Sequence, residues 1–186
     1  MILNKIFSRL CTILLLFFSN HLFALDTERE MTITLHASEK ESVDIGQISF
    51  AAEKNGYRYE LTFDDKIEKY FLSMHPFQCL KNPEIMVCHL PYPYQNNKFI
   101  TSDDMVDLEY DLMFLHKKTG GYGIDPWNGI YYKLRLDDNG IEGVLHDTDM
   151  NVLTAPPEDG NLRPLTHDLL YKANPAKHWF PTITIH

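Results

Sequence analysis

The chain has 186 residues, of which 44% are hydrophobic and 12% aromatic, and its 26 acidic and 17 basic residues give a net charge of −9. This length is enough for one domain with a substantial hydrophobic core. Because nucleic acids and anionic lipid surfaces repel a chain of this charge, neither is an expected partner.

The first 24 residues have the layout of a secretory signal peptide. Two basic residues precede an apolar run at 10–18, and a short polar break then leads to Ala24. The run is shorter than the roughly 20 apolar residues that a membrane-spanning helix needs, so we expect cleavage after Ala24 and no membrane span afterwards. Cys11 would leave with residues 1–24. Residues 25–186 should then form a single β-rich domain in the periplasm or outside the cell.

Much of the remaining sequence alternates apolar and polar residues with period two, which predicts antiparallel strands with one exposed face. Residues 31–37 and 57–63 alternate in this way, and residues 43–50 change phase at Gly46, which predicts a β-bulge. Asn55-Gly56 predicts a tight hairpin turn with positive φ angles. Further strands are expected at residues 69–75, 85–90, 129–136, 141–146 and 182–186.

The strands at 129–136 and 141–146 form the clearest predicted hairpin, because Asp137-Asp138-Asn139-Gly140 lies between them. Its buried face would carry Ile130, Tyr132, Leu134 and Leu136. Several short strands joined by local turns predict a mainly β fold. We expect an antiparallel meander that closes into a lipocalin-like barrel, with a sandwich as the alternative.

Cys79 and Cys88 are the two cysteines of the expected mature chain. Pairing the strands around a turn at Pro83-Glu84 places the two residues directly opposite each other. In an oxidising compartment such a pair normally closes, so we predict a structural disulfide. A redox pair is usually Cys-x-x-Cys, which does not fit, and a zinc site with His75 and His89 is the other alternative.

Residues 101–121 fit two patterns. Val106, Leu108, Tyr110, Leu112 and Phe114 alternate as in a strand, although other apolar residues of the segment form one helical stripe. Capping residues at 101–104 and two lysines before Gly120 favour a helix, which we place near 102–117.

The stretch 122–132, "YGIDPWNGIYY", combines a predicted turn with an aromatic side chain. Buried, Trp127 would plug one end of a barrel. Exposed, it could stack on a sugar or peptide together with Tyr122, Asp125 and Asn128, which are therefore ligand-facing candidates.

The stretch 147–158 has the spacing of a calcium-binding loop. Its ligands would be Asp147, Asp149, Asn151, the Leu153 carbonyl and Glu158. Against calcium, Val152 occupies the position where such loops have glycine, and Pro156-Pro157 forbids the usual exit helix. We therefore favour an ordinary polar turn, with calcium binding as the alternative.

No nucleophile motif, phosphate loop or dinucleotide fingerprint is present in the sequence, and we expect no cofactor. His146-Asp147 and His167-Asp168 could each supply an acid–base pair, as could Asp107, Glu109 or Asp111 with a distant partner. Any carboxylate-rich sequence offers such combinations, so they carry little weight.

Three stretches, "FLSMHPFQC", "CHLPYPY" and "GIDPWNGIYY", resemble exported proteins of Gram-negative bacteria that have no established activity. The resemblance spans most of the expected mature chain and implies the periplasm. It brings no functional residue.

We therefore expect an exported, non-catalytic binding or envelope-associated protein, whose partner is a small molecule or an envelope protein. The alternative is a periplasmic hydrolase that uses His and Asp or Glu side chains. A hydrolase should gather His146, Asp147 and other carboxylates in one concave site, whereas a binding protein should have an apolar cavity.

Overall fold

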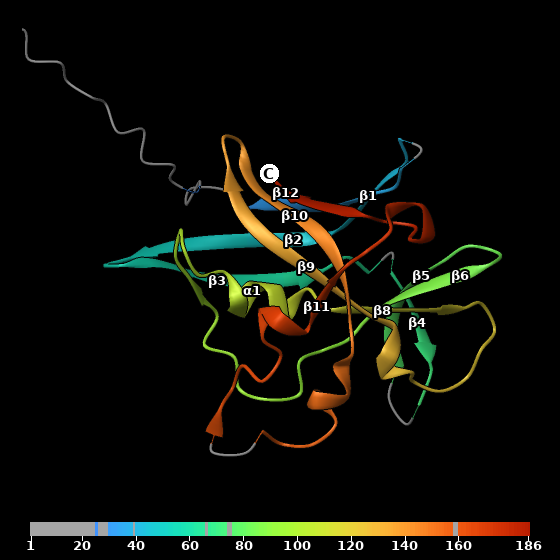
Figure 1. The fold of residues 1–186 in the computed structure, drawn as a ribbon. Coiled ribbons are helices and arrows are strands. Elements are labelled where there is room, and N and C mark those ends of the chain that lie inside the picture. Colours follow the sequence, from blue (N-terminus) through green and yellow to red (C-terminus); the bar gives the residue numbers. More distant parts are fainter. Residues whose placement is uncertain (1–24, 26–29, 39, 66, 74–75, 158–159) are drawn as a thin grey trace, which may run out of the picture.

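The computed structural model of the protein describes residues 25, 30–38, 40–65, 67–73, 76–157 and 160–186. The predicted signal peptide, residues 1–24, lies outside the described residues. Within the described part, twelve strands form one antiparallel sheet, and a single α-helix packs against it (Figure 1). The predicted mainly β fold with one helix is confirmed.

The strands are β1 Met31–His36, β2 Ser42–Glu53, β3 Gly56–Phe63, β4 Glu68–Phe71, β5 Pro76–Lys81, β6 Ile85–His89, β7 Phe99–Ile100, β8 Phe114–Lys118, β9 Gly129–Asp137, β10 Gly140–Thr148, β11 Leu170–Lys172 and β12 Thr182–Ile185. The helix is α1 Val106–Asp111, and the described 3-10 turns are η1 Pro126–Asn128, η2 Met150–Leu153, η4 His167–Leu169 and η5 Pro175–Lys177.

The sheet has the strand order β4-β5-β6-β8-β9-β10-β12-β1-β2-β3-β7, with β11 also paired to β10. Among the described residues the two edge strands, β4 and β7, do not pair with each other, so the sheet is not closed into a barrel. Neither the lipocalin-like barrel nor the sandwich is confirmed.

Although it is open, the sheet bends back on itself. The rings of Phe63 in β3 and His89 in β6 lie 4.2 Å apart between centroids, even though six strands separate β3 from β6 in the sheet. The main core fills the concave side of this bend. Leu108 of helix α1 and Leu112, its C-cap residue, belong to that core, and both side chains are fully buried.

The register of the strands follows the alternation of the sequence. The β1–β2 pairing shifts between Ile33 and Thr34, where Ile45 is the extra residue beside Gly46, so the predicted bulge is confirmed. In the β9–β10 hairpin, Asp137 pairs with Gly140 as expected. Of its predicted inward residues, three are buried and Leu136 is half-buried.

The β2–β3 hairpin forms, but its turn differs from the prediction. Glu53 pairs with Gly56, so Lys54 and Asn55 make the loop, and neither Asn55 nor Gly56 has a positive φ. The glycine is needed for packing instead. A Cβ on Gly56 would lie 2.2 Å from the carbonyl oxygen of Ile100 in the neighbouring β7.

The helix is much shorter than the predicted 102–117. The Thr101 hydroxyl accepts backbone hydrogen bonds from Asp103 and Asp104, but the helix starts only at Val106, after an N-cap residue without a capping side chain. After Asp111 the chain turns into β8, which pairs with β6 and β9. In the second half of segment 101–121 the chain therefore forms a strand and not a helix, because β8 pairs with β6 on one side and with β9 on the other.

The three carboxylates of α1 are anchored by partners from distant segments. Asp107 accepts hydrogen bonds from Arg163 at 2.6 and 2.9 Å, and Glu109 accepts from the Tyr131 hydroxyl and the Leu134 amide at 2.5 and 2.7 Å. Asp111 accepts from the Tyr59 hydroxyl at 2.9 Å. Because buried carboxylates are costly without partners, these bonds fix α1 against the sheet.

Candidate functional site

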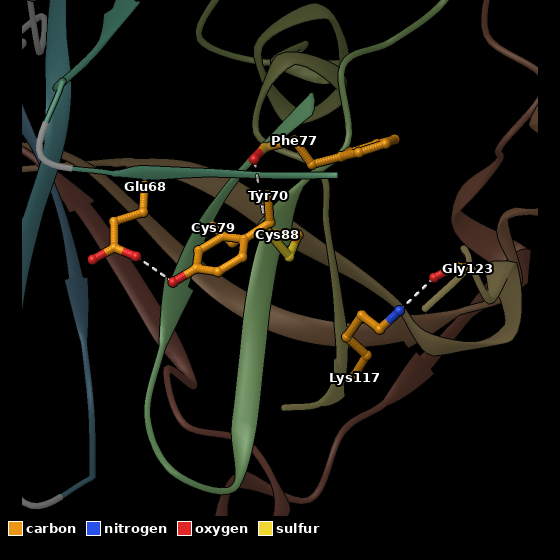
Figure 2. Close-up of a disulfide and its surroundings, with 7 residues drawn as sticks. All are labelled: Glu68, Tyr70, Phe77, Cys79, Cys88, Lys117 and Gly123. Carbon is orange, nitrogen blue, oxygen red and sulfur yellow. Dashed lines mark hydrogen bonds between the residues drawn. A yellow bond between two sulfur atoms is a disulfide. The ribbon is translucent and has the colours of Figure 1, made fainter. Parts of the chain in front are cut away.

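The β5–β6 hairpin carries a disulfide between Cys79 and Cys88, whose Cα atoms lie 4.0 Å apart, so the predicted pairing is confirmed. The turn is also as expected: the Asn82 side-chain oxygen accepts from the amides of Glu84 and Ile85 at 2.8 and 2.7 Å. Tyr70 of the adjacent β4 lies over this hairpin, and its hydroxyl donates to Glu68 (Figure 2). Both sulfurs are bonded to each other, so the hairpin offers no thiolate to a metal.

The disulfide lies on the outer face of the sheet, opposite the main core. Along this face Cys79, Cys88, Leu115 and Gly129 stand in one row across β5, β6, β8 and β9. Met150 of η2 packs over Gly129, where a Cβ would lie only 2.7 Å from the Met150 Cγ atom. The outer face thus supports two small apolar clusters in place of one continuous core.

We call these the disulfide cluster and the Met150 cluster. The first comprises Leu72, Phe77, Cys79, Met86, Cys88 and Leu115, and the second comprises Tyr110, Met113, Tyr131, Met150, Leu153 and Leu165. Leu90 is half-buried and packs against both.

An apolar cleft of about 480 Å³ lies where the two clusters meet. It is lined by Ser73, Pro76, Phe77, Leu90, Pro91, Pro93, Leu115, Ile124, Pro126, Met150, Leu153 and Thr154. Only Ser73 and Thr154 bring polar side chains to this lining. A concave site of this size with apolar walls and few polar groups is typical of small-molecule binding sites.

Prolines make up a third of the lining and stiffen the walls, because each fixes its φ angle and removes an amide donor. In the segment after β6, Pro91 and Pro93 face the cleft. The tyrosines that follow these prolines bond elsewhere: Tyr92 donates its hydroxyl to the Leu162 carbonyl, and Tyr94 donates to that of Leu153 at 3.2 Å. The two tyrosines therefore brace the wall from behind.

The opposite wall is the loop from β8 to η1. The Lys117 ammonium donates to the Gly123 carbonyl (Figure 2), and the Gly123 amide donates to the Leu72 carbonyl at 2.9 Å. Burial lowers the pKa of Lys117. These bonds hold the loop so that Ile124, 39% exposed, lies at the mouth of the cleft.

The four predicted ligand-facing residues lie in or beside η1. Asp125 accepts from the Trp127 amide at 3.1 Å and from the Asn128 side chain at 3.2 Å, which forms the 3-10 turn. This turn points Pro126 into the cleft and leaves Trp127 70% exposed, so the expectation that Trp127 plugs a barrel is wrong. Tyr122 is 82% exposed. Contact of these residues with a ligand stays a prediction.

The calcium-like set is divided between different structures. Asp147 lies in β10 and contacts His178, whereas Asp149 accepts from the Asn151 amide and side chain as the N-cap of η2. Val152 lies within that 3-10 turn, and Glu158 is outside the described residues. The spacing of a calcium loop is thus not accompanied by its geometry, and calcium binding stays a prediction.

The suggested acid–base pairs do not gather in one place. His146 and Asp147 are neighbours on a strand, so their side chains point to opposite faces of the sheet. His167 approaches Glu109 at 3.5 Å, while Asp168 accepts from the Thr166 hydroxyl. His89, a ligand of the alternative zinc site in the sequence analysis, donates its ring Nε2–H to the Asp111 carbonyl at 3.0 Å.

Comparison of the chain with protein-family models, curated proteins and solved structures gave no match. The fold and the cleft therefore define the protein only as an antiparallel β protein with an apolar site on its outer face, and the resemblance to exported proteins stays a prediction. Among the helices of the described segments, none combines the length and apolar character needed to cross a membrane.

Sequence reasoning missed the cleft because it assumed one buried face per strand. A signal was nevertheless present. Residues 85–88 and 112–115 are apolar without alternation, which is typical of strands covered on both faces. The second covered face of β6 and β8 is the outer one, where the cleft lies.

Proposed function

We propose that the protein is an exported, periplasmic, non-catalytic binding protein that holds a small apolar molecule in the outer-face cleft. The observation that carries this proposal is the cleft itself, about 480 Å³ in volume and walled by aliphatic, aromatic and proline side chains. Small-molecule sites commonly have volumes of roughly 300–1,000 Å³, so one ligand with an apolar body and one or two polar atoms fits.

Export is supported by two features. The N-terminal layout is that of a signal peptide, and the Cys79–Cys88 disulfide is of the kind that persists in oxidising compartments such as the periplasm. The disulfide also serves the proposed site. It joins β5 to β6 beside Phe77, which lines the cleft, and so holds that wall in position.

The alternative hydrolase has less support. It requires His146 and Asp147 with other carboxylates in one concave site, but these two side chains face opposite sides of β10. The carboxylates of α1 are already occupied by the hydrogen bonds that anchor the helix. These observations support the non-catalytic proposal over the hydrolase.

A dye titration tests the proposal. N-phenyl-1-naphthylamine is apolar and becomes fluorescent when water is excluded, so we expect saturable one-to-one binding. The variant Ile124→Glu places a carboxylate at the mouth of the cleft and should weaken binding by about tenfold, because that charge must lose water when the dye enters.

The matched control is Val144→Glu. Val144 is also an exposed β-branched residue, 47% exposed, but it lines a separate cavity of about 230 Å³ beside His178. This variant should bind the dye like the wild type. Absence of saturable binding, or equal affinity in wild type and Ile124→Glu, would refute the cleft as the binding site.

A further inference from the structure

Three side chains that the proposed function does not use lie close to one another in the fold. They are His116 of β8, Asp147 of β10 and His178, which follows η5. One ligand atom from each can be chosen so that all three lie within 4.8 Å of one another. In sequence, Asp147 follows His116 by 31 positions and His178 follows Asp147 by another 31, so only the fold brings the three residues together.

The strand register places Asp147 at a core-facing position. It pairs with Ile130 of β9, which in turn pairs with Phe114 of β8, and both of these are buried in the main core. His116 is two residues beyond Phe114 and thus on the same face of β8. A carboxylate and an imidazole therefore stand where the alternation would place apolar side chains.

His178 closes the group from the C-terminal segment. Its side chain is only 5% exposed, and its Nε2 atom lies 2.9 Å from an Asp147 carboxylate oxygen. Its ring also meets that of His116 edge-on, with centroids 5.3 Å apart.

His116 completes the group as a side chain without a competing partner. Within the described segments its ring nitrogens make no hydrogen bond, although the residue is half-buried. Its imidazole is therefore available to a ligand that Asp147 and His178 can also reach.

We propose that His116, Asp147 and His178 bind one zinc ion. Two imidazole nitrogens and one carboxylate oxygen are donors that suit Zn²⁺, whereas Ca²⁺ and Mg²⁺ prefer oxygen ligands. In a tetrahedral site with bonds of about 2.1 Å, ligand atoms are separated by roughly 3.4 Å. The three ligand atoms lie within 4.8 Å of one another, so zinc binding would draw the more widely separated side chains closer together.

This zinc site differs from the calcium-like loop, although the two share Asp147. A calcium site would draw Asp147 toward Asp149 and Asn151. Asp149, however, is the N-cap of η2 and accepts hydrogen bonds from the amide and the side chain of Asn151. Zinc would keep Asp147 where it already is, beside His178.

Zinc binding should stabilise the fold, because the ion would connect β8 and β10 to the C-terminal segment. At a zinc concentration 100 times the dissociation constant, we expect the Tm to rise by roughly 5–10 °C. The same concentration of Ca²⁺ should not raise it.

The test uses zinc chloride and the oxidised protein purified without a histidine tag. Titration against a chromophoric zinc chelator should give one ion per chain, and Co²⁺ in place of zinc should give the intense visible absorption of a four-coordinate site. His116→Gln, Asp147→Asn and His178→Gln should each weaken zinc binding by at least about tenfold. Melting without metal shows whether each variant folds.

The control is His146→Gln, which removes a histidine that neighbours Asp147 in sequence but faces the other side of β10 and hydrogen-bonds to the Val144 carbonyl. It should bind zinc like the wild type. If His178→Gln fails to fold, His116→Gln decides, because its side chain makes no hydrogen bond that the described fold needs. Equal zinc affinity in His116→Gln and wild type, or no Tm shift with zinc, overturns the proposal.

Discussion

At the scale of single residues, the fully buried polar atoms of the described side chains all have hydrogen-bond partners. The Glu109 carboxylate, for example, accepts hydrogen bonds from the Tyr131 hydroxyl and the Leu134 amide. Burial raises the pKa of Tyr131, and the nearby Glu109 carboxylate raises it further. The sequence showed the acids of α1 but could not reveal partners such as Tyr131, Tyr59 and Arg163, which lie 22, 52 and 56 positions away.

His89 makes stability depend on pH. Burial lowers its pKa to about 4, whereas an unfolded histidine has a pKa of about 6.5. Between these values the unfolded chain binds a proton that the folded protein does not, so stability is full above pH 6.5 and falls as the pH drops. We expect a loss of about 2 kcal/mol from pH 7 to pH 5.

Urea unfolding of wild type and His89→Gln at pH 7 and pH 5 measures this contribution. The variant should be less stable at pH 7, because it loses the ring contacts with Phe63 and Phe114. Its free energy of unfolding should, however, fall by about 2 kcal/mol less than that of the wild type between pH 7 and pH 5. If both proteins lose the same free energy between the two pH values, His89 is not the group responsible.

At the scale of elements, local patterns predicted the hairpins and distant packing decided the rest. The β9–β10 hairpin, the bulge at Gly46 and the disulfide hairpin follow from alternation and turn residues within about 20 positions. The helix near 102–117 was predicted too long, because residues 114–118 pair with β6 and β9, and no local signal shows that pairing.

The disulfide stabilises its hairpin by restricting the unfolded chain. Closing a loop of about ten residues contributes roughly 2.5–3 kcal/mol on the chain-entropy estimate. The free energy of unfolding of the double variant Cys79→Ser/Cys88→Ser should therefore be lower by that amount, as measured by urea unfolding. It should also bind the naphthylamine dye more weakly, because Phe77 is then held less firmly at the cleft.

Cys11→Ser is the control for this variant, since Cys11 lies in the predicted signal peptide and should be absent from the mature protein. Unchanged stability of the double variant would show that the hairpin packing alone holds β5 to β6.

At the scale of the whole molecule, the two faces of one sheet have different roles. The concave face holds the main core with α1, and the outer face of β5, β6 and β8 carries the two clusters that border the cleft. The sequence predicted the β content and an apolar ligand site. The position of the cleft could not be predicted, because no local pattern shows that residues 76–77, 90–93, 124–126 and 150–154 meet outside the sheet.

The most direct test of the central claim is to locate a bound apolar molecule by methyl NMR. With methyl-labelled Ile, Leu and Met residues and increasing naphthylamine dye, we expect the signals of Leu90, Leu115, Ile124, Met150 and Leu153 to shift together and saturate at one equivalent. Signals of Ile33, Leu108 and Ile183 in the main core should stay in place. Shifts confined to the main core, or no shifts at saturating dye, would contradict the account.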